Sequence, residues 1–177
     1  MNTPPNLKLF ISATSLAQYP LDQPNQSMRH ALSSVNVADL FPEPVGTNSH
    51  VQCVLSGLWL LHGYLDEAHE ICQAVPTAEG SFWHAIMHRM EQDYWNSKYW
   101  YQKIGQHAVL DRIAARLQKR WQPGHFVDEC EKFRGTGARV AQASDIRRLS
   151  QIEWQELFQY CWEQACGQSF PSHLLEK

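Results

Sequence analysis

Two neighbouring segments of the chain, residues 51–75 and 80–105, carry the same helical pattern, and this repetition constrains the fold more than any other feature. Three apolar residues of the first segment recur 29 positions later in the second: Val54, Leu58 and Leu61 align with Trp83, Met87 and Met90. Each set has the spacing of one buried helical face. A turn and a second apolar stripe come next in both segments. The segments are therefore predicted to form two similar antiparallel helical hairpins.

The rest of the chain also carries helical rather than strand patterns. No segment convincingly alternates apolar and polar residues as a half-buried strand does. Beyond the hairpins, the expected elements are a helix over 28–40, helices over 109–121 and 125–133, a loop over 134–144 and a long helix ending near Cys166. We predict an all-α fold of stacked antiparallel helical hairpins, with two detectable repeats, followed by C-terminal helices.

The N-terminal stretch differs in composition from the rest of the chain. Residues 1–27 contain four prolines together with several Asn, Gln and Ser residues. This composition is typical of an extended or poorly ordered arm. The remaining residues, 28–177, are expected to form a single all-helical domain, which at this length can bury a sizeable core.

Composition and charge narrow the expected partners and compartment. The net charge of −3 gives no general reason to expect nucleic acid or an anionic membrane as a partner. No apolar run approaches the roughly 20 residues of a membrane span, and the N-terminus lacks the basic region of a secretory signal. The five cysteines form no CxxC pair, which favours reduced thiols. We expect a soluble cytoplasmic protein with no membrane partner.

Residues 79–107 combine aromatic and ionisable side chains and supply the candidate site. His84, His88 and Glu91 are spaced i, i+4, i+7, which places them on one side of a helix. Two neutral imidazoles and a carboxylate can ligate a divalent metal such as Zn, Fe, Ni or Mn, or can act without metal in acid/base chemistry. His62 aligns with Glu91 in the repeat and is the first candidate for a further ligand. The alternative is structural, with histidines that hydrogen-bond to neighbouring helices and an exposed Glu91.

Polar residues just beyond this trio extend the candidate site. Arg89 and Asp93 are four positions apart, which favours a local ion pair. The functional alternative is a pocket in which Arg89 binds an anion while Asn96 and Trp100 orient an organic ligand. The full set of candidate ligand-binding residues is His84, His88, Arg89, Glu91, Asp93, Asn96 and Trp100. We expect core and helix-packing roles, in preference to a stacking platform for a ligand, for four aromatic residues: Tyr94, Trp95, Tyr99 and Tyr101.

A basic glycine-containing stretch, Arg134–Arg139, offers a weaker signal. Its sequence RGTGAR has the small residues that let backbone N–H groups surround a phosphate. It lacks the GKS/T ending of a P-loop, which favours a flexible basic loop. Nucleic-acid binding is a third, low-ranked hypothesis for this part of the chain.

A string of residues in the second segment resembles the signature of a known family. It runs Trp83-His84, His88-Arg89, Glu91, Asp93, Asn96 and Tyr99-Trp100, and then Gly105 and His107. This spacing resembles that of a family of small microbial helical proteins, and the resemblance implies no assigned activity. Residues 51–105 also resemble tetratricopeptide repeats, whose period is 34 residues. That resemblance implies helical hairpins of a kind often used for protein binding.

Two functional hypotheses from different classes are consistent with these patterns. The first is a polar His/Arg/Glu pocket that binds a small anionic ligand or a divalent metal ion, with or without catalysis, and the sequence assigns no catalytic residue. The second is a non-enzymatic module of helical hairpins that binds a protein partner. A closed, concave arrangement of the histidines, Arg and Glu favours the first hypothesis, and an open groove favours the second.

Overall fold

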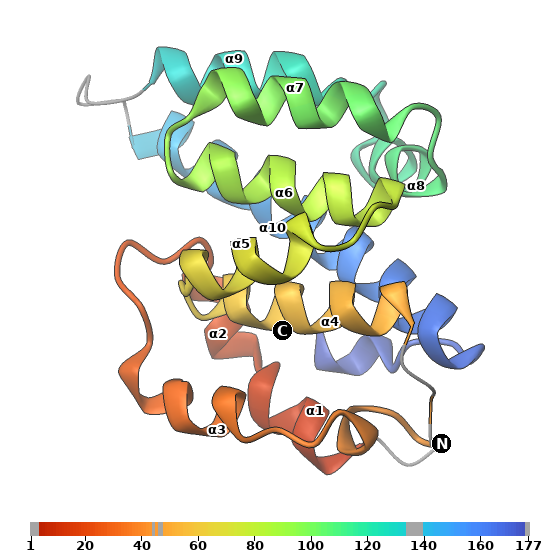
Figure 1. Ribbon diagram of the computed structural model, residues 1–177. Coiled ribbons are helices and arrows are strands. Elements are labelled where there is room, and N and C mark those ends of the chain that lie inside the picture. Colours follow the sequence, from red (N-terminus) through yellow and green to blue (C-terminus); the bar gives the residue numbers. More distant parts are fainter. Residues whose placement is uncertain (1–3, 44, 46–47, 134–139, 176–177) are drawn as a thin grey trace.

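The computed structural model describes residues 4–43, 45, 48–133 and 140–175, and these residues contain helices and no strands (Figure 1). The predicted all-α fold class is confirmed. The helices are α1 (Pro5–Phe10), α2 (Ala13–Gln18), α3 (Arg29–Ser33), α4 (Ser49–Leu61), α5 (Leu65–Gln73), α6 (Ala78–Met90), α7 (Tyr94–Ile104), α8 (Ala108–Leu117), α9 (Pro123–Lys132) and α10 (Val140–Cys166). Three 3-10 turns accompany them, η1 (Gln26–Met28), η2 (Val37–Leu40) and η3 (Ser172–Leu174).

The centre of the molecule is a stack of two helical hairpins, α4 with α5 and α6 with α7. Figure 1 shows the four helices one above another in chain order, with α10 passing behind them. Both hairpin turns contain a residue with positive φ, Gly63 at 78° and Gln92 at 67°. These two residues are 29 positions apart, so the sequence repeat coincides with a repeat in backbone conformation.

The two turns also match in their individual backbone hydrogen bonds. The Tyr64 N–H donates to the Trp59 carbonyl at 3.0 Å, and the Asp93 N–H donates to the His88 carbonyl at 2.9 Å. Donor and acceptor of the second bond each lie 29 positions after those of the first. The two turns are therefore equivalent in backbone geometry as well as in sequence position.

Each hairpin also contains a side-chain hydrogen bond between equivalent positions. The donor lies on the first helix in one hairpin and on the second helix in the other. In the first hairpin the Ser56 hydroxyl donates to the Ala68 carbonyl at 3.1 Å. In the second, the Ser97 hydroxyl donates to the Ala85 carbonyl at 2.7 Å. Ser56 aligns with Ala85, and Ala68 aligns with Ser97. Small residues at both positions let the paired helices approach closely. The serine lies on the first helix of one hairpin and on the second helix of the other.

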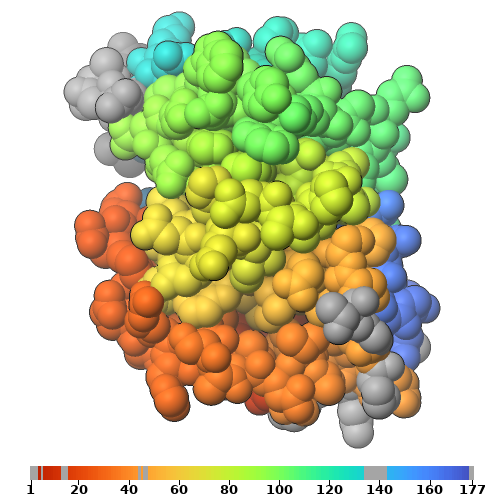
Figure 2. Space-filling view, viewed as in Figure 1, coloured from red at the N-terminus to blue at the C-terminus, as the bar shows by residue number. Residues whose placement is uncertain are grey.

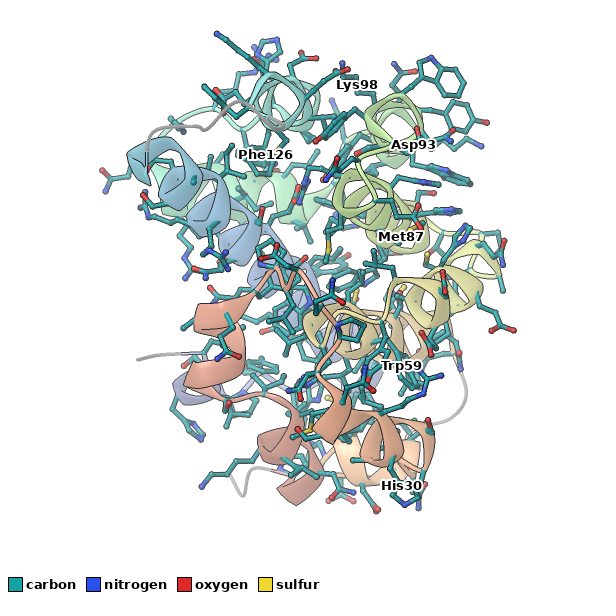
Figure 3. All side chains as sticks on the ribbon, turned by 90° about the vertical axis from the view of Figure 1, so that its left-hand side faces the viewer. His30, Trp59, Met87, Asp93, Lys98 and Phe126 are labelled. Atoms are coloured by element: carbon teal, nitrogen blue, oxygen red, sulfur yellow. The ribbon has the colours of Figure 1, made fainter. Side chains whose placement is uncertain are left out.

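The core lies where α10 crosses the hairpins. Gly57 allows the helices to approach closely at this crossing. A Cβ added to Gly57 would lie 2.8 Å from the Trp83 ring and 2.9 Å from the Phe158 ring. The Trp154 indole N–H donates to the Gly57 carbonyl at 2.9 Å. Side chains fill the space between the elements from His30 at one end to Lys98 at the other (Figure 3).

The predicted N-terminal arm is wrong for the residues the structure describes. Residues 4–27 include α1 and α2, and Leu7, Phe10 and Tyr19 are buried in the core. The Pro, Asn and Gln content suggested an open chain, but Leu7, Phe10 and Ile11 have the i, i+3, i+4 spacing of a short buried helical face. Burial of these apolar side chains fixes the segment against the hairpins.

Two further boundaries differ from the expected ones. Residues 28–40 form the last residue of η1, then α3 and the whole of η2, instead of one helix. The final helix α10 begins at Val140, so residues 140–144 are helical where a loop was expected. The stretch Arg134–Arg139, with its hypothesis of a phosphate-binding loop, lies outside the described residues.

The structure also bears on the apolar character of the helices and on the state of the cysteines. Within the described ranges, no helix combines the length and the apolar character needed to cross a membrane. All five cysteines are free thiols. Burial raises the pKa of the Cys161 thiol well above its ordinary value, so this sulfur is protonated at neutral pH.

Candidate functional site

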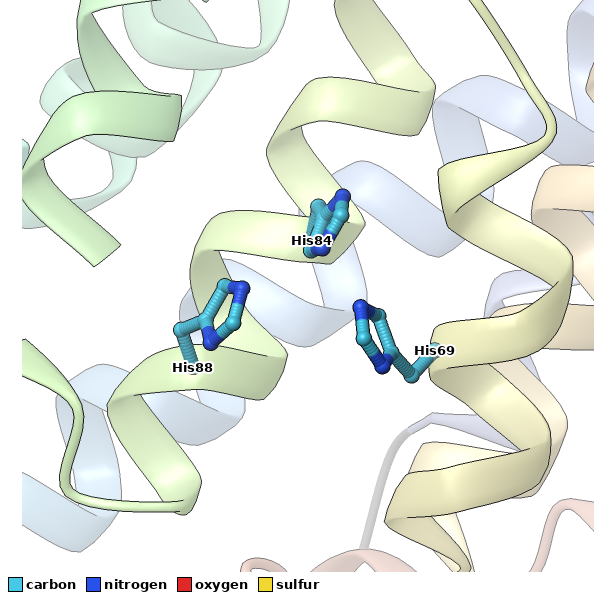
Figure 4. Close-up of side chains that lie close together, drawn as sticks. All are labelled: His69, His84 and His88. Atoms are coloured by element: carbon cyan, nitrogen blue, oxygen red, sulfur yellow. The ribbon is translucent and has the colours of Figure 1, made fainter. Parts of the chain in front are cut away.

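Helices α5 and α6 bring three histidines together, His69 from α5 and His84 and His88 from α6 (Figure 4). Each offers one ring nitrogen, and these three atoms lie within 4.8 Å of one another. The His84 and His88 rings stack with centroids 4.8 Å apart, and the His69 ring lies 4.7 Å from His84 and 5.5 Å from His88. We call these three residues the histidine cluster.

Local sequence explains why the two helices present these side chains to each other. His84 and His88 are four positions apart and therefore share one side of α6. The connection from α5 to α6 closes tightly over Gly80, where an added Cβ would lie 2.2 Å from the Val75 carbonyl oxygen. On the face shown in Figure 2, side chains of α5 lie next to those of the α6–α7 hairpin. This close approach brings His69 within reach of the pair.

Burial keeps the imidazoles on α6 uncharged. His84 is 4% exposed, and burial, reinforced by His88, His69 and Lys103, lowers its pKa to about 4. Burial also lowers the pKa of His88, an effect opposed by the nearby carboxylates of Glu91 and Asp93. A neutral imidazole is the form that binds a metal ion. The cluster therefore holds two metal-competent rings at neutral pH.

Two carboxylates lie beside the Nδ1 atom of His88. Glu91 Oε2 is 3.3 Å from it and Asp93 Oδ2 is 3.8 Å from it. The Asn96 side-chain amide donates to Asp93 Oδ2 at 2.6 Å, and this bond is the main cause of the lowered Asp93 pKa. A carboxylate at one ring nitrogen favours a proton there and leaves the other nitrogen, Nε2, free to act as a ligand.

Trp100 covers the outer face of His84. The two rings stack with centroids 4.0 Å apart and an interplanar angle of 17°. The Lys103 ammonium lies 4.6 Å from the Trp100 ring. His84 Nδ1 is buried and has no hydrogen-bond partner among the described residues. Buried ring nitrogens usually have a hydrogen-bond partner, so this atom is available to a ligand, a metal or an ordered water.

Arg89 belongs to a different part of the molecule, which corrects its predicted place in the site. One position along a helix turns the side chain by about 100°, so Arg89 points away from the cluster. Its guanidinium contacts Glu153 Oε2 at 2.5 Å and donates to the Tyr101 hydroxyl at 2.5 Å. The Tyr101 hydroxyl donates to Glu153 Oε1 at 2.6 Å. The expected ion pair with Asp93 is replaced by this buried network, since Asp93 instead caps α7.

The two other residues predicted as metal ligands, His62 and Glu91, lie outside the histidine cluster. His62 donates through Nε2 to the Phe10 carbonyl at 3.0 Å, which ties α4 to the N-terminal segment and away from the cluster. Glu91 lies beside His88 but is not among the three converging ligand atoms. Of the candidate set, the structure groups His84, His88, Glu91, Asp93, Asn96 and Trp100, and it separates Arg89 and His62 from them.

The third member of the cluster, His69, was not predicted. Its partners are 15 and 19 positions away in the sequence, beyond the range of any single-helix pattern. His69 directly follows Ala68, which the structure shows to be fully buried in α5. Helix α5 lies between α4 and α6 (Figure 1), but the spacing of residues along one helix does not reveal which neighbouring helix a given side meets.

The aromatic residues of α7 divide between core and surface. Tyr94 and Tyr101 are buried as expected, but Trp95 is 74% exposed and Tyr99 is 42% exposed. The Trp95 and Tyr99 rings are nearly parallel, with centroids 6.0 Å apart. The expectation that all four are packing residues of the core is therefore wrong for Trp95 and Tyr99.

Comparisons with known proteins add no identity to this geometry. The chain matches no protein-family model, no curated protein and no solved structure.

Proposed function

We propose that the protein binds a divalent transition-metal ion through the imidazoles of His69, His84 and His88. The observation that carries the proposal is the convergence of three ring nitrogens, from two helices, within 4.8 Å of one another. Imidazole is a preferred ligand of Zn, Cu, Ni and Fe. The buried, unpartnered Nδ1 of His84 supports the presence of a group that the described residues do not supply.

The spacing of the rings suits an ion after a small adjustment. Nitrogen ligands about 2.0–2.1 Å from a tetrahedral ion lie about 3.4 Å apart. The rings would therefore draw together on binding, by side-chain rotation within the existing arrangement. The negative charges of Glu91 and Asp93 near the Nδ1 of His88 would favour a proton on that atom and increase the basicity of the ring.

Three protein ligands leave at least one coordination position open. Sites of this kind hold water or a small anion at the fourth position, and they are typical of catalytic rather than purely structural zinc. The proposed ion would thus unite two sequence-based expectations, since a small anionic ligand would bind through the metal. The proposal concerns binding and assigns no reaction.

The test is metal binding by tag-free protein, measured by calorimetry and elemental analysis with Zn, Ni, Co and Mn. We expect one ion per chain, and binding at least about 100-fold weaker in His69→Ala and in the His84→Ala, His88→Ala double variant. The matched control is His30→Ala, which removes an exposed histidine of α3 and should bind normally. Acidification should weaken binding because protonated imidazoles do not coordinate.

Two results would overturn the proposal. Sub-stoichiometric metal in the wild-type protein for all four ions would leave the histidines as hydrogen-bonding groups. Equal affinity in wild type and His69→Ala would show that α5 contributes no ligand and that the cluster is not the site. Circular dichroism of each variant separates loss of binding from loss of folding.

A further inference from the structure

A cavity of about 640 Å³ lies apart from the histidine cluster, at the other side of α6. None of the three histidines lines it. Its walls come from the segment after α2, the start of α5, the α6–α7 turn, the end of α9 and the first half of α10. Pockets of about 300–1,000 Å³ are typical of small-molecule sites.

The cavity wall combines polar and apolar side chains, with slightly more apolar than polar surface. Leu65, Met90 and Ile146 contribute side chains from three different helices or their ends. All three are only half-buried in the protein, so each keeps apolar surface for a further contact. Covering such surface stabilises a complex because apolar area is removed from water. The cavity therefore favours a ligand with an apolar body.

Two arginines line the cavity. Arg89 is buried in the wall, and Arg147 is exposed at the rim. The Arg147 guanidinium donates through Nη1 to the Gln18 carbonyl at 2.8 Å and the Pro20 carbonyl at 3.2 Å, which hold it in place beside the opening. Hydrogen bonds to carbonyl oxygens position the Arg147 guanidinium without neutralising it. Its positive charge therefore remains at the rim of the cavity.

The acidic residues near the cavity do not form an ion pair with Arg147 within the described residues. Glu153 pairs with Arg89 from outside the cavity lining. Asp22 belongs to the lining but is exposed to water, and no ion pair joins it to Arg147 within the described residues. A guanidinium has five N–H donors and binds carboxylates in a two-pronged geometry. The carbonyl contacts of Nη1 leave donors of Arg147 available for such a group.

We propose that this cavity binds a small organic carboxylate with an apolar body. The carboxylate pairs with Arg147 at the rim, and the apolar body lies against Leu65, Met90 and Ile146. Arg89 is already paired with Glu153 and closes the inner wall as part of the fold. This site is independent of the proposed metal site, because the two share no side chain.

The experiment uses octanoate as the probe, with octanamide and acetate as its chemical controls, titrated into full-length protein by calorimetry. We expect one saturable site for octanoate. Octanamide lacks the charge and should bind at least about tenfold more weakly, which corresponds to the loss of one charge-assisted pair. Acetate lacks the apolar body and should show no saturable binding.

Matched variants locate the site. Arg147→Gln should weaken octanoate binding by about tenfold and leave octanamide binding unchanged. Arg148→Gln is the control, since it removes the neighbouring exposed arginine, which does not line the cavity. Equal octanoate affinity in the two variants, equal affinity of wild type for octanoate and octanamide, or no saturable octanoate binding would each overturn the proposal. His69→Ala should bind octanoate normally, which separates this result from that of the metal test.

Discussion

The buried network of Arg89, Tyr101 and Glu153 allows a sharp test of what holds α6, α7 and α10 together. The Arg89 and Glu153 side chains are 4% and 0% exposed. Replacing Glu153 by Ala removes the carboxylate that accepts from both other side chains and leaves a guanidinium in the core. Removing one partner of a buried ion pair costs about 3–5 kcal/mol of stability. We expect Glu153→Ala to lower the free energy of unfolding by that amount.

We expect the cost to come from the unpaired buried charge and not from the lost attraction alone. Desolvation of two buried ions largely offsets their mutual attraction, so an apolar replacement of both is often neutral. The double variant Arg89→Met, Glu153→Leu should therefore be more stable than Glu153→Ala. Urea unfolding followed by tryptophan fluorescence gives each value, and a double-mutant cycle isolates the coupling.

An exposed pair supplies the matched control. Arg116 on α8 contacts Glu156 on α10 at 3.0 Å, and the Arg116 side chain is 41% exposed. Surface pairs contribute only about 0–1 kcal/mol, so Arg116→Ala should change the free energy of unfolding by less than about 1 kcal/mol. If Glu153→Ala costs no more than Arg116→Ala, or if the double variant costs as much as the two single changes added, the loss of stability does not come from an unpaired buried charge.

Three further outcomes are expected. Gly57→Ala should lower the free energy of unfolding by about 1–3 kcal/mol, because its Cβ meets the Trp83 ring at 2.8 Å; a thermal melt identical to wild type would show that the crossing relaxes freely. Trp83→Ala deletes a fully buried indole and should cost about 3–5 kcal/mol in urea unfolding, and a cost below about 1 kcal/mol would contradict its place in the core. A hydrogen bond from His107 is the main cause that lowers the Glu79 pKa from 4.5 to about 2. The stability from Glu79 is therefore present above pH 4.5 and lost as the pH falls towards 2. Glu79→Gln should flatten stability-against-pH curves in that range by about 2–3 kcal/mol, and parallel curves for the two proteins would rule this out.

The elements that could be predicted are those specified by local spacing. The stripes of Val54, Leu58 and Leu61 and their counterparts 29 positions later give helices whose existence needs no knowledge of the fold. His84 and His88 were grouped correctly because one helix holds both. The N-terminal helices were missed because proline content outweighed the brief apolar spacing around Leu7.

The parts that could not be predicted depend on which helices pack together. His69 joins the cluster through the contact between α5 and α6, and helix spacing carries no information about that contact. Arg89 had an acceptable local partner in Asp93, but its partner in the fold, Glu153, lies on α10. A local pair is favoured by spacing alone, whereas burial selects the partner that satisfies the charge inside the core.

The position of the histidine cluster relative to the repeat has a consequence for how binding and folding are linked. His69 belongs to the second helix of the first hairpin, while His84 and His88 belong to the first helix of the second hairpin. Their counterparts in the other copy are Lys98, Leu55 and Trp59, so neither hairpin contains the site by itself. An ion held there would join the two copies, and separating them would release it. Metal affinity would then report on hairpin docking, and slowed amide exchange across α5 and α6 on adding metal would measure that linkage.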